Sequence, residues 1–319
     1  MTGLALDPPS QPSFFDQVGV GDYVEDGRTD IRDLEALNAR LSAAQPEVVF
    51  HLAAQSLVRC SYRDPVLTYE TNAIGTLHVL EAVRQTASVG AVVVVTSDKC
   101  YQNQERADYA YVETDPLGGH DPYSASKACA ELIPQSCRNV LCAEPARSIG
   151  VATVRAGNVI GGGDWAKDRL VPDLVRGVLA NREVEIRNPD AVRPWQHVLE
   201  PLMGYLLLAE CLCQEPMSFA ESWNFGPLLA DTRPVKWIAD FFAREAGLRW
   251  NRGIEPTPHE AQFLSVDASK AQARLGWHPQ LSLEEALELV LDWHQAQQAG
   301  KDMRAVSLSQ IEHYQEAAV

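Results

Sequence analysis

Short apolar runs alternate with amphipathic stretches along the first half of the chain. The runs Glu47–Ala54, Ala91–Thr96 and Val151–Val159 are mostly apolar, as strands are when a parallel sheet is covered on both faces. Apolar residues recur at helical spacing over Val66–Arg84, and a second helix is predicted over Tyr123–Ile133. This order predicts an α/β fold with a doubly wound, Rossmann-type parallel sheet, whose ligands lie at the carboxyl ends of the strands.

The composition of the chain changes after about Asn158, where glycines, prolines and tryptophans become frequent. A smaller, loop-rich lobe laid over the carboxyl edge of the sheet fits this composition. We therefore predict a nucleotide-binding domain over residues 1–157. Residues 158–319 should form mainly a substrate-binding lobe, with some segments returning to the first domain. Pro134 should end or kink the second predicted helix, because proline lacks the backbone N–H that a helix interior needs.

Composition narrows the classes of partner. The chain has 319 residues and a net charge of −16, with 27 Lys and Arg against 43 Asp and Glu. A surface this acidic repels nucleic acid and anionic membranes. Seven cysteines without CxxC spacing predict free thiols rather than disulfides or a structural metal site. No apolar run reaches about 18 residues, so we predict a soluble, cytoplasmic protein.

The motif Tyr123-Ser-Ala-Ser-Lys127 carries the sharpest chemical signal. Residues i and i+4 share one face of a helix, and an ammonium beside a phenol stabilises the phenolate and lowers its pKa. Such a pair can remove a proton from a substrate hydroxyl, and the lysine can also hold a ribose. The alternative is structural: a half-buried tyrosine and a solvated lysine give the same spacing.

Polar residues follow two of the predicted strands directly. Ser97-Asp98-Lys99 comes after the run that ends at Thr96, where a doubly wound sheet places its chemistry. An ordinary loop would also account for these residues. Ala53-Ala54-Gln55 ends an earlier run with small side chains that let a flat ligand approach the backbone. Asn72 interrupts an otherwise apolar helix face.

Several segments together carry a resemblance to a known family. They are HLAAQ (51–55), SYRDP (61–65), TSDKCY (96–101), GGHDPYSASK (118–127), RAGNVIGGGDW (155–165), DRLVPD (168–173), RPWQHV (193–198) and PHEAQFLSVDASKAQARLGW (258–277). They resemble the extended short-chain dehydrogenase/reductase superfamily, and most closely its CDP-glucose 4,6-dehydratases. The resemblance runs over about residues 2–295.

That resemblance implies an internal redox cycle with NAD as cofactor. Tyr123, aided by Lys127 and Ser97, would take the proton of the sugar C4 hydroxyl. Asp98 would act as the acid at C6 and Lys99 as the base at C5, so that water is eliminated. The product would be CDP-4-keto-6-deoxyglucose.

The binding residues are also implied by the resemblance, and each has a structural alternative such as a cap or a surface charge. Besides Tyr123 and Lys127, the implied cofactor-binding residues are Asp30, Ile31, Ala53, Ala54, Gln55 and Asn72. The implied substrate-binding residues are Ser61, Asn158, Arg169, Arg193 and His197. His259 could touch the nucleotide or cap a turn. A homodimer that uses the Tyr123 helix is the family expectation.

One part of the family pattern is missing. The 319 residues contain no GxxGxxG turn, which in this fold joins the first strand to a helix that holds the cofactor diphosphate. Thr2–Asp7 resembles the second strand of the family. We therefore expect the first strand, turn and helix to be absent and NAD binding to be impaired. Truncation of the chain or a late start codon accounts for this better than a relic enzyme that has lost or altered its cofactor site, since the downstream motifs are intact.

Three functions remain open on the sequence. The first is a CDP-glucose 4,6-dehydratase. The second is another sugar-nucleotide dehydratase or a 4-epimerase, although Asp98 and Lys99 argue against an epimerase. The third is an inactive remnant that binds a nucleotide sugar.

Overall fold

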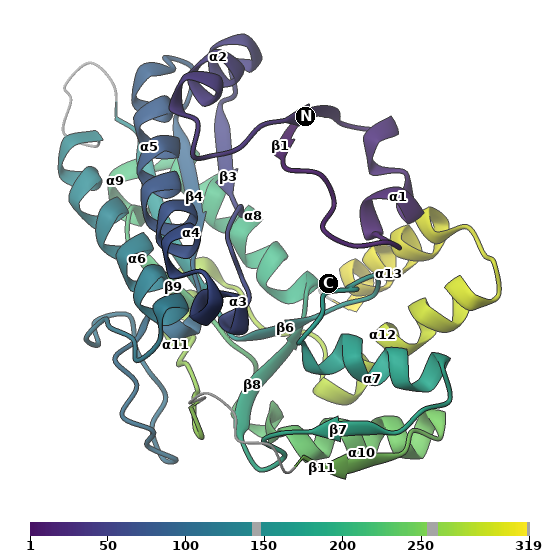
Figure 1. Cartoon of the computed structure of the whole chain (residues 1–319). Coiled ribbons are helices and arrows are strands. Elements are labelled where there is room, and N and C mark those ends of the chain that lie inside the picture. The colour runs from purple at the N-terminus through teal and green to yellow at the C-terminus, as the bar shows by residue number, and fades with distance from the viewer. Residues whose placement is uncertain (142–147, 254–260, 318–319) are drawn as a thin grey trace.

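A parallel four-stranded sheet forms the centre of the larger lobe in this computed structural model, which describes residues 1–141, 148–253 and 261–317. Its strand order is β3-β4-β5-β9, with all neighbours parallel (Figure 1). The strands are β3 (Val48–His51), β4 (Ala91–Val95), β5 (Gly150–Ala156) and β9 (Ser222–Phe225). The predicted α/β fold with a parallel sheet is therefore confirmed.

Helices cover both faces of this sheet, as its continuous apolar strands require. Val92 and Val94 of β4 pack in one core cluster with residues of α2 and α5. Ala91 and Val93 pack on the opposite face with α8 and α11. The helices around the sheet are α2 (Leu34–Ala44), α3 (Val58–Arg63), α4 (Pro65–Tyr69), α5 (Gly75–Gln85), α6 (Pro122–Leu141), α8 (Leu199–Gln214), α9 (Pro216–Phe219) and α11 (Ser269–Leu275).

A second, smaller lobe has its own core. Residues of α7, α10 and α12 pack there against strands β7 and β8. Its strands are β6 (Asn158–Ile160), β7 (Val184–Ile186), β8 (Val192–His197), β10 (Thr232–Pro234) and β11 (Trp250–Arg252). They form two small sheets of order β10-β8-β6 and β11-β7. The helices are α7 (Leu170–Leu179), α10 (Val235–Ala246), α12 (Leu283–Gln298) and α13 (Met303–Ala317).

The N-terminal strands form a separate sheet. β1 (Thr2–Ala5) pairs in parallel with β2 (Glu25–Arg28), and the short helix α1 (Phe14–Val18) lies between them in the chain. In the part of the chain that the structure describes, no strand joins β1 to β3, and Figure 1 shows the two apart. Phe50 on β3 is 37% exposed and Leu52 beyond it 52%. Among the described residues, the N-terminal pair of strands and the central sheet are therefore separate.

The strand predicted over Val151–Val159 is wrong in one respect, because the structure contains two strands there. β5 ends at Ala156 and β6 begins at Asn158, where it leaves the main sheet and pairs with β8. Gly157 lies between them, and a Cβ at this position would lie 2.6 Å from the carbonyl oxygen of Pro194. Glycine therefore permits the close approach of two backbones at which the chain changes sheet.

Two helices also differ from expectation. α6 continues past Pro134 to Leu141, so Pro134 does not end the helix, and of the two predicted effects, an end or a kink, the end is wrong. Cys137 packs against the core, and the Arg138 Nε donates to the Val151 carbonyl at 2.7 Å, which stabilises the last turns. The helix predicted over Val66–Arg84 contains a π-helical segment, Glu70–Ile74, between α4 and α5. Such insertions often occur at functional sites.

Candidate active site

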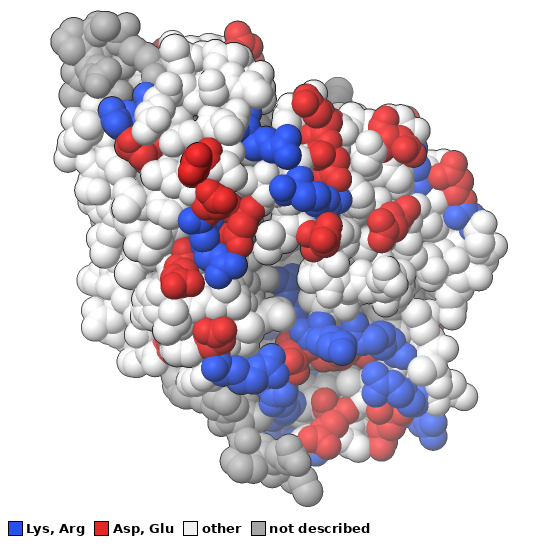
Figure 2. Space-filling view, turned by 45° about the horizontal axis from the view of Figure 1, so that its top comes forward, with Lys and Arg blue, Asp and Glu red and all other residues white. Residues whose placement is uncertain are grey.

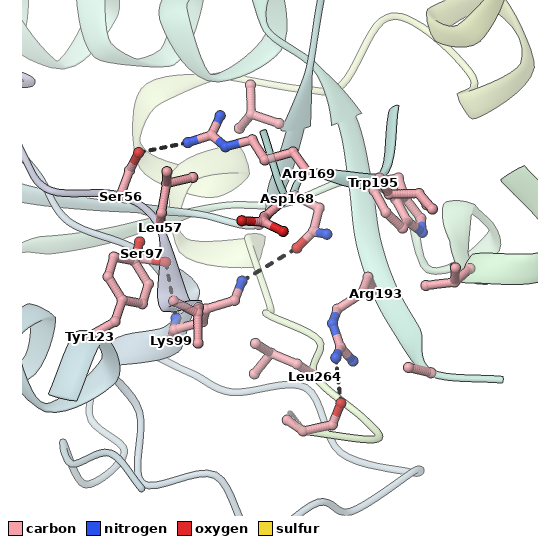
Figure 3. A pocket seen from close by; sticks show the side chains of 18 of the residues that line it. Ser56, Leu57, Ser97, Lys99, Tyr123, Asp168, Arg169, Arg193, Trp195 and Leu264 are labelled. Atoms are coloured by element: carbon pink, nitrogen blue, oxygen red, sulfur yellow. Dashed lines mark hydrogen bonds between the residues drawn. The ribbon is translucent and has the colours of Figure 1, made fainter. Parts of the chain in front are cut away.

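A cavity of about 640 Å³ lies between the carboxyl ends of the central strands and the second lobe. Figure 3 shows side chains from both lobes around it, with Tyr123, Ser97 and Lys99 on one side and Arg193 and Trp195 on the other. The predicted site residues that line the cavity are Ser97, Lys99, Tyr123, Asn158, Arg169 and Arg193. The structure therefore brings residues from four distant sequence segments to one place.

The segment Ser97–Lys99 forms a tight turn at the end of β4. The Ser97 Oγ accepts from the Lys99 backbone N–H at 3.2 Å and donates to the Asp98 Oδ1 at 3.0 Å. The Lys99 Nζ donates to the same Asp98 oxygen at 3.3 Å and to the Asn158 Oδ1 at 3.4 Å. Asp98 is fully buried, and its Oδ2 has no hydrogen-bond partner among the described residues. One acid and one amine are therefore held in contact beside the cavity.

Tyr123 lies in the first turn of α6. Asp121 caps that turn by accepting from the Ser124 N–H at 2.9 Å. Burial raises the pKa of Tyr123 to about 12, partly offset by a hydrogen bond with Ser97. The prediction that Lys127 lowers this pKa is wrong, because the charges that act on the phenol come from Asp98, Arg169 and Asp121. Desolvation outweighs the attraction of the Arg169 guanidinium.

Lys127 lies one turn further along α6 and is almost completely buried. Its Nζ makes one hydrogen bond to a described residue, to the Val95 carbonyl at 3.4 Å. Burial lowers the pKa of Lys127 to about 8, although Cys100 and Glu131 act to raise it. An ammonium has three donors, so this side chain retains capacity to bind the hydroxyls of a ligand.

The residues after β3 are tied to the π-helical segment. Asn72 accepts from the Gln55 N–H at 2.8 Å and donates to the Gln55 carbonyl at 2.9 Å. It also donates to the Ser126 Oγ of α6 at 2.9 Å. Asn72 is thus a buried connector that fixes the Ala53–Gln55 backbone relative to the helix of Tyr123. Its π-helical setting explains the polar residue on an apolar face.

Asp30 and Ile31 lie beyond β2. The Asp30 carboxylate accepts from the side chain of Arg32, with the closest contact at 2.6 Å, and Arg32 lowers the pKa of Asp30. Ile31 is buried and packs in the core cluster with α5. A Cβ on Gly75 would lie 2.6 Å from the Ile31 side chain, so this glycine allows the two segments to meet.

Arginines from both lobes surround the cavity. Arg169 donates to the Ser56 Oγ at 2.7 Å, and Arg59 pairs with Asp168 at 3.1 Å. These contacts join the loop after β3 to the second lobe. Arg193 donates to the Val192 carbonyl at 2.8 Å and to the Ala261 carbonyl. Figure 2 shows blue side chains gathered along the hollow in the middle of this face.

Two predicted substrate-binding residues lie apart from the cavity. Ser61 is fully buried in α3 and donates to the Val58 carbonyl at 2.7 Å. His197 is buried at the end of β8, with its Nδ1 accepting weakly from the Leu199 N–H at 3.4 Å. Neither residue lines the cavity. His259 lies outside the described residues.

The buried His197 predicts acid sensitivity. Burial lowers its pKa from 6.5 to about 4, so the unfolded chain binds the proton at a higher pH than the folded chain. Stability contributed by this residue is therefore lost as the pH falls from about 6.5 to about 4. The free energy of unfolding of the parent chain should fall between pH 7 and pH 5. We expect that fall to be about 2 kcal/mol smaller in the His197→Gln variant. Urea unfolding at both pH values measures this difference, and equal losses contradict the prediction.

The sequence reasoning missed a buried ion pair beneath the site. Arg155 on β5 donates to the Glu131 Oε2 at 2.7 Å, and the two side chains are 2% and 1% exposed. Thr96, which precedes Ser97, donates to Glu131, and Arg155 donates to the Tyr101 hydroxyl at 2.8 Å. The pair therefore holds both ends of the Ser97–Lys99 turn. The charged Arg155 inside a mostly apolar predicted strand was the feature of the sequence that could have indicated a buried ion pair.

The described cysteines, Cys60, Cys100, Cys129, Cys137, Cys211 and Cys213, are free thiols, and Cys142 lies outside the described residues. Among those same residues there is no cluster of three metal-binding side chains. None of the described helices is both long and apolar enough to span a bilayer.

Comparison with known proteins places this fold and site in a class. A family model described as GDP-mannose 4,6 dehydratase matches residues 21–220. The solved dTDP-glucose 4,6-dehydratase of Streptomyces venezuelae, with NAD bound, superposes with a TM-score of 0.75. It is 22% identical and covers 90% of this chain and 84% of its own. The UDP-glucose 4-epimerase of Thermus thermophilus also has a TM-score of 0.75 at 22% identity, covering 92% of this chain and 99% of its own. The class is the extended short-chain dehydrogenases/reductases.

Sequence similarity narrows this class. The chain is 49% identical over 321 residues to the CDP-glucose 4,6-dehydratase of Salmonella typhimurium, which covers 99% of this chain and 89% of that protein. The dTDP-glucose 4,6-dehydratase of Haemophilus influenzae is 25% identical over 288 residues, covering 84% of this chain and 81% of that protein. The chain therefore belongs to this family of sugar-nucleotide 4,6-dehydratases.

Proposed function

We propose that this protein catalyses the NAD-dependent conversion of CDP-glucose to CDP-4-keto-6-deoxyglucose, as a hydro-lyase. The observation that carries the proposal is the contact between the buried Asp98 and Lys99, which lines the same cavity as Tyr123. Oxidation of a sugar hydroxyl needs one base, whereas elimination of water needs a further acid and base. The 49% identity to a CDP-glucose 4,6-dehydratase supports the choice of substrate.

Tyr123 takes the proton from the sugar C4 hydroxyl in this mechanism. Its ring and the Ser97 hydroxyl lie side by side at the cavity wall (Figure 3). Ser97 also hydrogen-bonds to Asp98, so it orients the reacting groups relative to one another. Tyr123 accepts this proton as the phenolate and becomes the neutral phenol. Because burial raises the pKa of Tyr123 to about 12, the phenolate is the less populated form at neutral pH.

Asp98 and Lys99 carry out the elimination. The 4-keto group makes the C5 proton acidic, and Lys99 removes it. Asp98 donates a proton to the C6 hydroxyl, which leaves as water while the C5–C6 double bond forms. The contact between the Lys99 Nζ and the Asp98 Oδ1 allows the proton gained at one group to replenish the other.

The residues present fit the nicotinamide half of NAD, which when bound accepts the hydride from C4 and returns it to C6. Lys127 has spare donors for ribose hydroxyls, and Ala53, Ala54 and Gln55 form a backbone that Asn72 holds in place. Asp30, next to Ile31, offers a carboxylate to the adenosine end. The residues between β1 and α1 are mostly proline and serine, so we assign no residue to the diphosphate of NAD.

The substrate residues follow from the cavity. Asn158 lies within reach of Lys99 and is suited to the hexose. Arg169 and Arg193 supply donors for the diphosphate of the nucleotide sugar, since one guanidinium group can donate two parallel hydrogen bonds to phosphate oxygens. Ser61 and His197 would act only through neighbouring residues, because neither lines the cavity.

Product analysis tests this proposal. The protein is incubated with NAD and CDP-, dTDP- or GDP-glucose, and products are analysed by mass spectrometry and NMR. We expect loss of one water and a 4-keto-6-deoxy product from CDP-glucose. An epimer formed without loss of water, or a keto product from dTDP-glucose alone, contradicts the assignment. Titration with NAD shows separately whether the chain binds its cofactor.

A homodimer is part of the proposal. Apolar side chains are exposed on α4, on the π-helical segment Glu70–Ile74 and on α6. These three elements pack against one another (Figure 1). Val66 is 65% exposed and Leu132 52%, and such patches mark interfaces. We expect Leu132→Glu to convert a dimer into a monomer in light scattering, with Leu206→Glu on α8 as the exposed control. A parent chain that is already monomeric contradicts this interface.

We also propose a cytoplasmic location, which the free thiols of the described cysteines support. Fractionation of the producing cells tests it, because recovery outside the cytoplasm contradicts it.

A further inference from the structure

One end of the cavity is formed entirely by the second lobe. Glu185 of β7 lines it, together with Arg187, Asn188 and Ala191 after β7 and Val235 at the start of α10. The reacting hexose must lie beside Tyr123 and Lys99 if the proposed function holds, and this inference rests on that function. The nucleoside is joined to the hexose through a diphosphate, so it extends away from Tyr123 into the second lobe.

Arg187 is the unusual residue at this end. β7 pairs with β11, and the Gly253 N–H donates to the Ile186 carbonyl at 2.8 Å, which fixes the backbone next to Arg187. The side chain is half-buried. Its Nη1 is buried and has no hydrogen-bond partner in the part of the chain that the structure describes. A buried donor without an acceptor costs free energy, so a bound ligand is a natural source of that acceptor.

The other cavity arginines differ from Arg187 in this respect. Arg59 pairs with Asp168, and Arg169 donates to Ser56. Arg193 donates to the backbone carbonyls of Val192 and Ala261. Within the described residues, no acidic side chain forms an ion pair with Arg187. Its guanidinium therefore remains available to a neutral acceptor group.

A guanidinium offers only donors, in a rigid planar fork. The pairing edge of cytosine presents two adjacent acceptors, N3 and O2, whereas uracil and thymine place an N3–H donor there. A fork of donors matches the first edge and opposes the second. We propose that Arg187 is the specificity-determining residue that binds the N3/O2 edge of cytosine and so selects CDP-sugars over UDP- and dTDP-sugars.

Binding of CDP and UDP, measured by calorimetry, tests the proposal without requiring turnover. We expect the parent chain to bind CDP about 10- to 100-fold more tightly than UDP, the range for one paired base contact. Glutamine carries one donor and one acceptor, so Arg187→Gln should weaken CDP binding about 10-fold or more and bring the two affinities close together. Arg187→Lys keeps the charge but not the fork, and should lose the same preference.

Two controls separate the possible results. Arg182→Gln removes an exposed positive charge from the same lobe outside the cavity and should leave both affinities unchanged. Equal weakening of CDP and UDP by Arg187→Gln would show a phosphate contact and overturn the proposal, as would an unchanged preference. A chain that binds CDP selectively but forms no keto product contradicts the proposed function and leaves the role of Arg187 standing.

Discussion

Replacement of Tyr123 by phenylalanine should reduce the rate of dehydration by about 10³-fold, within the range for loss of a general base. The Tyr123 phenol lies at the cavity wall beside Ser97, with which it forms a hydrogen bond. Phenylalanine keeps the ring that fills this buried position, so the fold should be retained. The measurement is the steady-state formation of keto product from CDP-glucose with NAD, using chain shown to be folded by circular dichroism.

Tyr109→Phe is the matched control for this variant. The Tyr109 hydroxyl donates to Asp115 at 3.0 Å and does not line the cavity. Its rate should remain within about twofold of the parent rate. If Tyr123→Phe turns over normally, another residue removes the C4 proton, and the assignment of the base is wrong.

Removal of Glu131 should have the largest effect on stability. Glu131→Gln leaves the Arg155 guanidinium buried without its counter-charge, which costs roughly 3–5 kcal/mol. Thr96 and Tyr101 depend on the same pair, so the Ser97–Lys99 turn should loosen and the rate should also fall. Thermal unfolding monitored by circular dichroism measures the effect as a loss of several degrees in Tm.

A double variant shows whether this loss comes from the unpaired charge. Glu131→Leu combined with Arg155→Met removes both charges at similar volume, and such replacements are often neutral for stability. We expect the double variant to regain most of the Tm that Glu131→Gln loses. A double variant as unstable as Glu131→Gln would show that the surrounding hydrogen bonds carry the stability instead.

Strand and helix positions in the sheet lobe could be predicted because burial on both faces leaves a clear pattern. Ala91–Thr96 is continuously apolar and forms β4 almost residue for residue. The division of Val151–Val159 could not be predicted from that pattern, since the apolar run continues through Gly157. The backbone contact with Pro194, distant in sequence, decides where β5 ends.

The candidate site was predicted unevenly for a similar reason. Residues that directly follow a strand, such as Ser97 and Lys99, have their place set by local topology. His197 and Ser61 point into protein rather than the cavity, and only tertiary packing determines that. Arg187 was not singled out, because one arginine after a short strand carries no signal until the cavity around it is known.

In the part of the chain that the structure describes, β3 is an edge strand of the central sheet, and this has a consequence for how the protein must be handled. A strand with unpaired N–H and C=O groups along one side is a template for another chain, and Phe50 and Leu52 add exposed apolar surface there. Contact between two molecules along this edge would build a continuous sheet across them. Aggregation should therefore increase with protein concentration and with mild denaturant more steeply than a net charge of −16 would suggest. Covering this edge with an added strand should slow the aggregation of purified protein during storage.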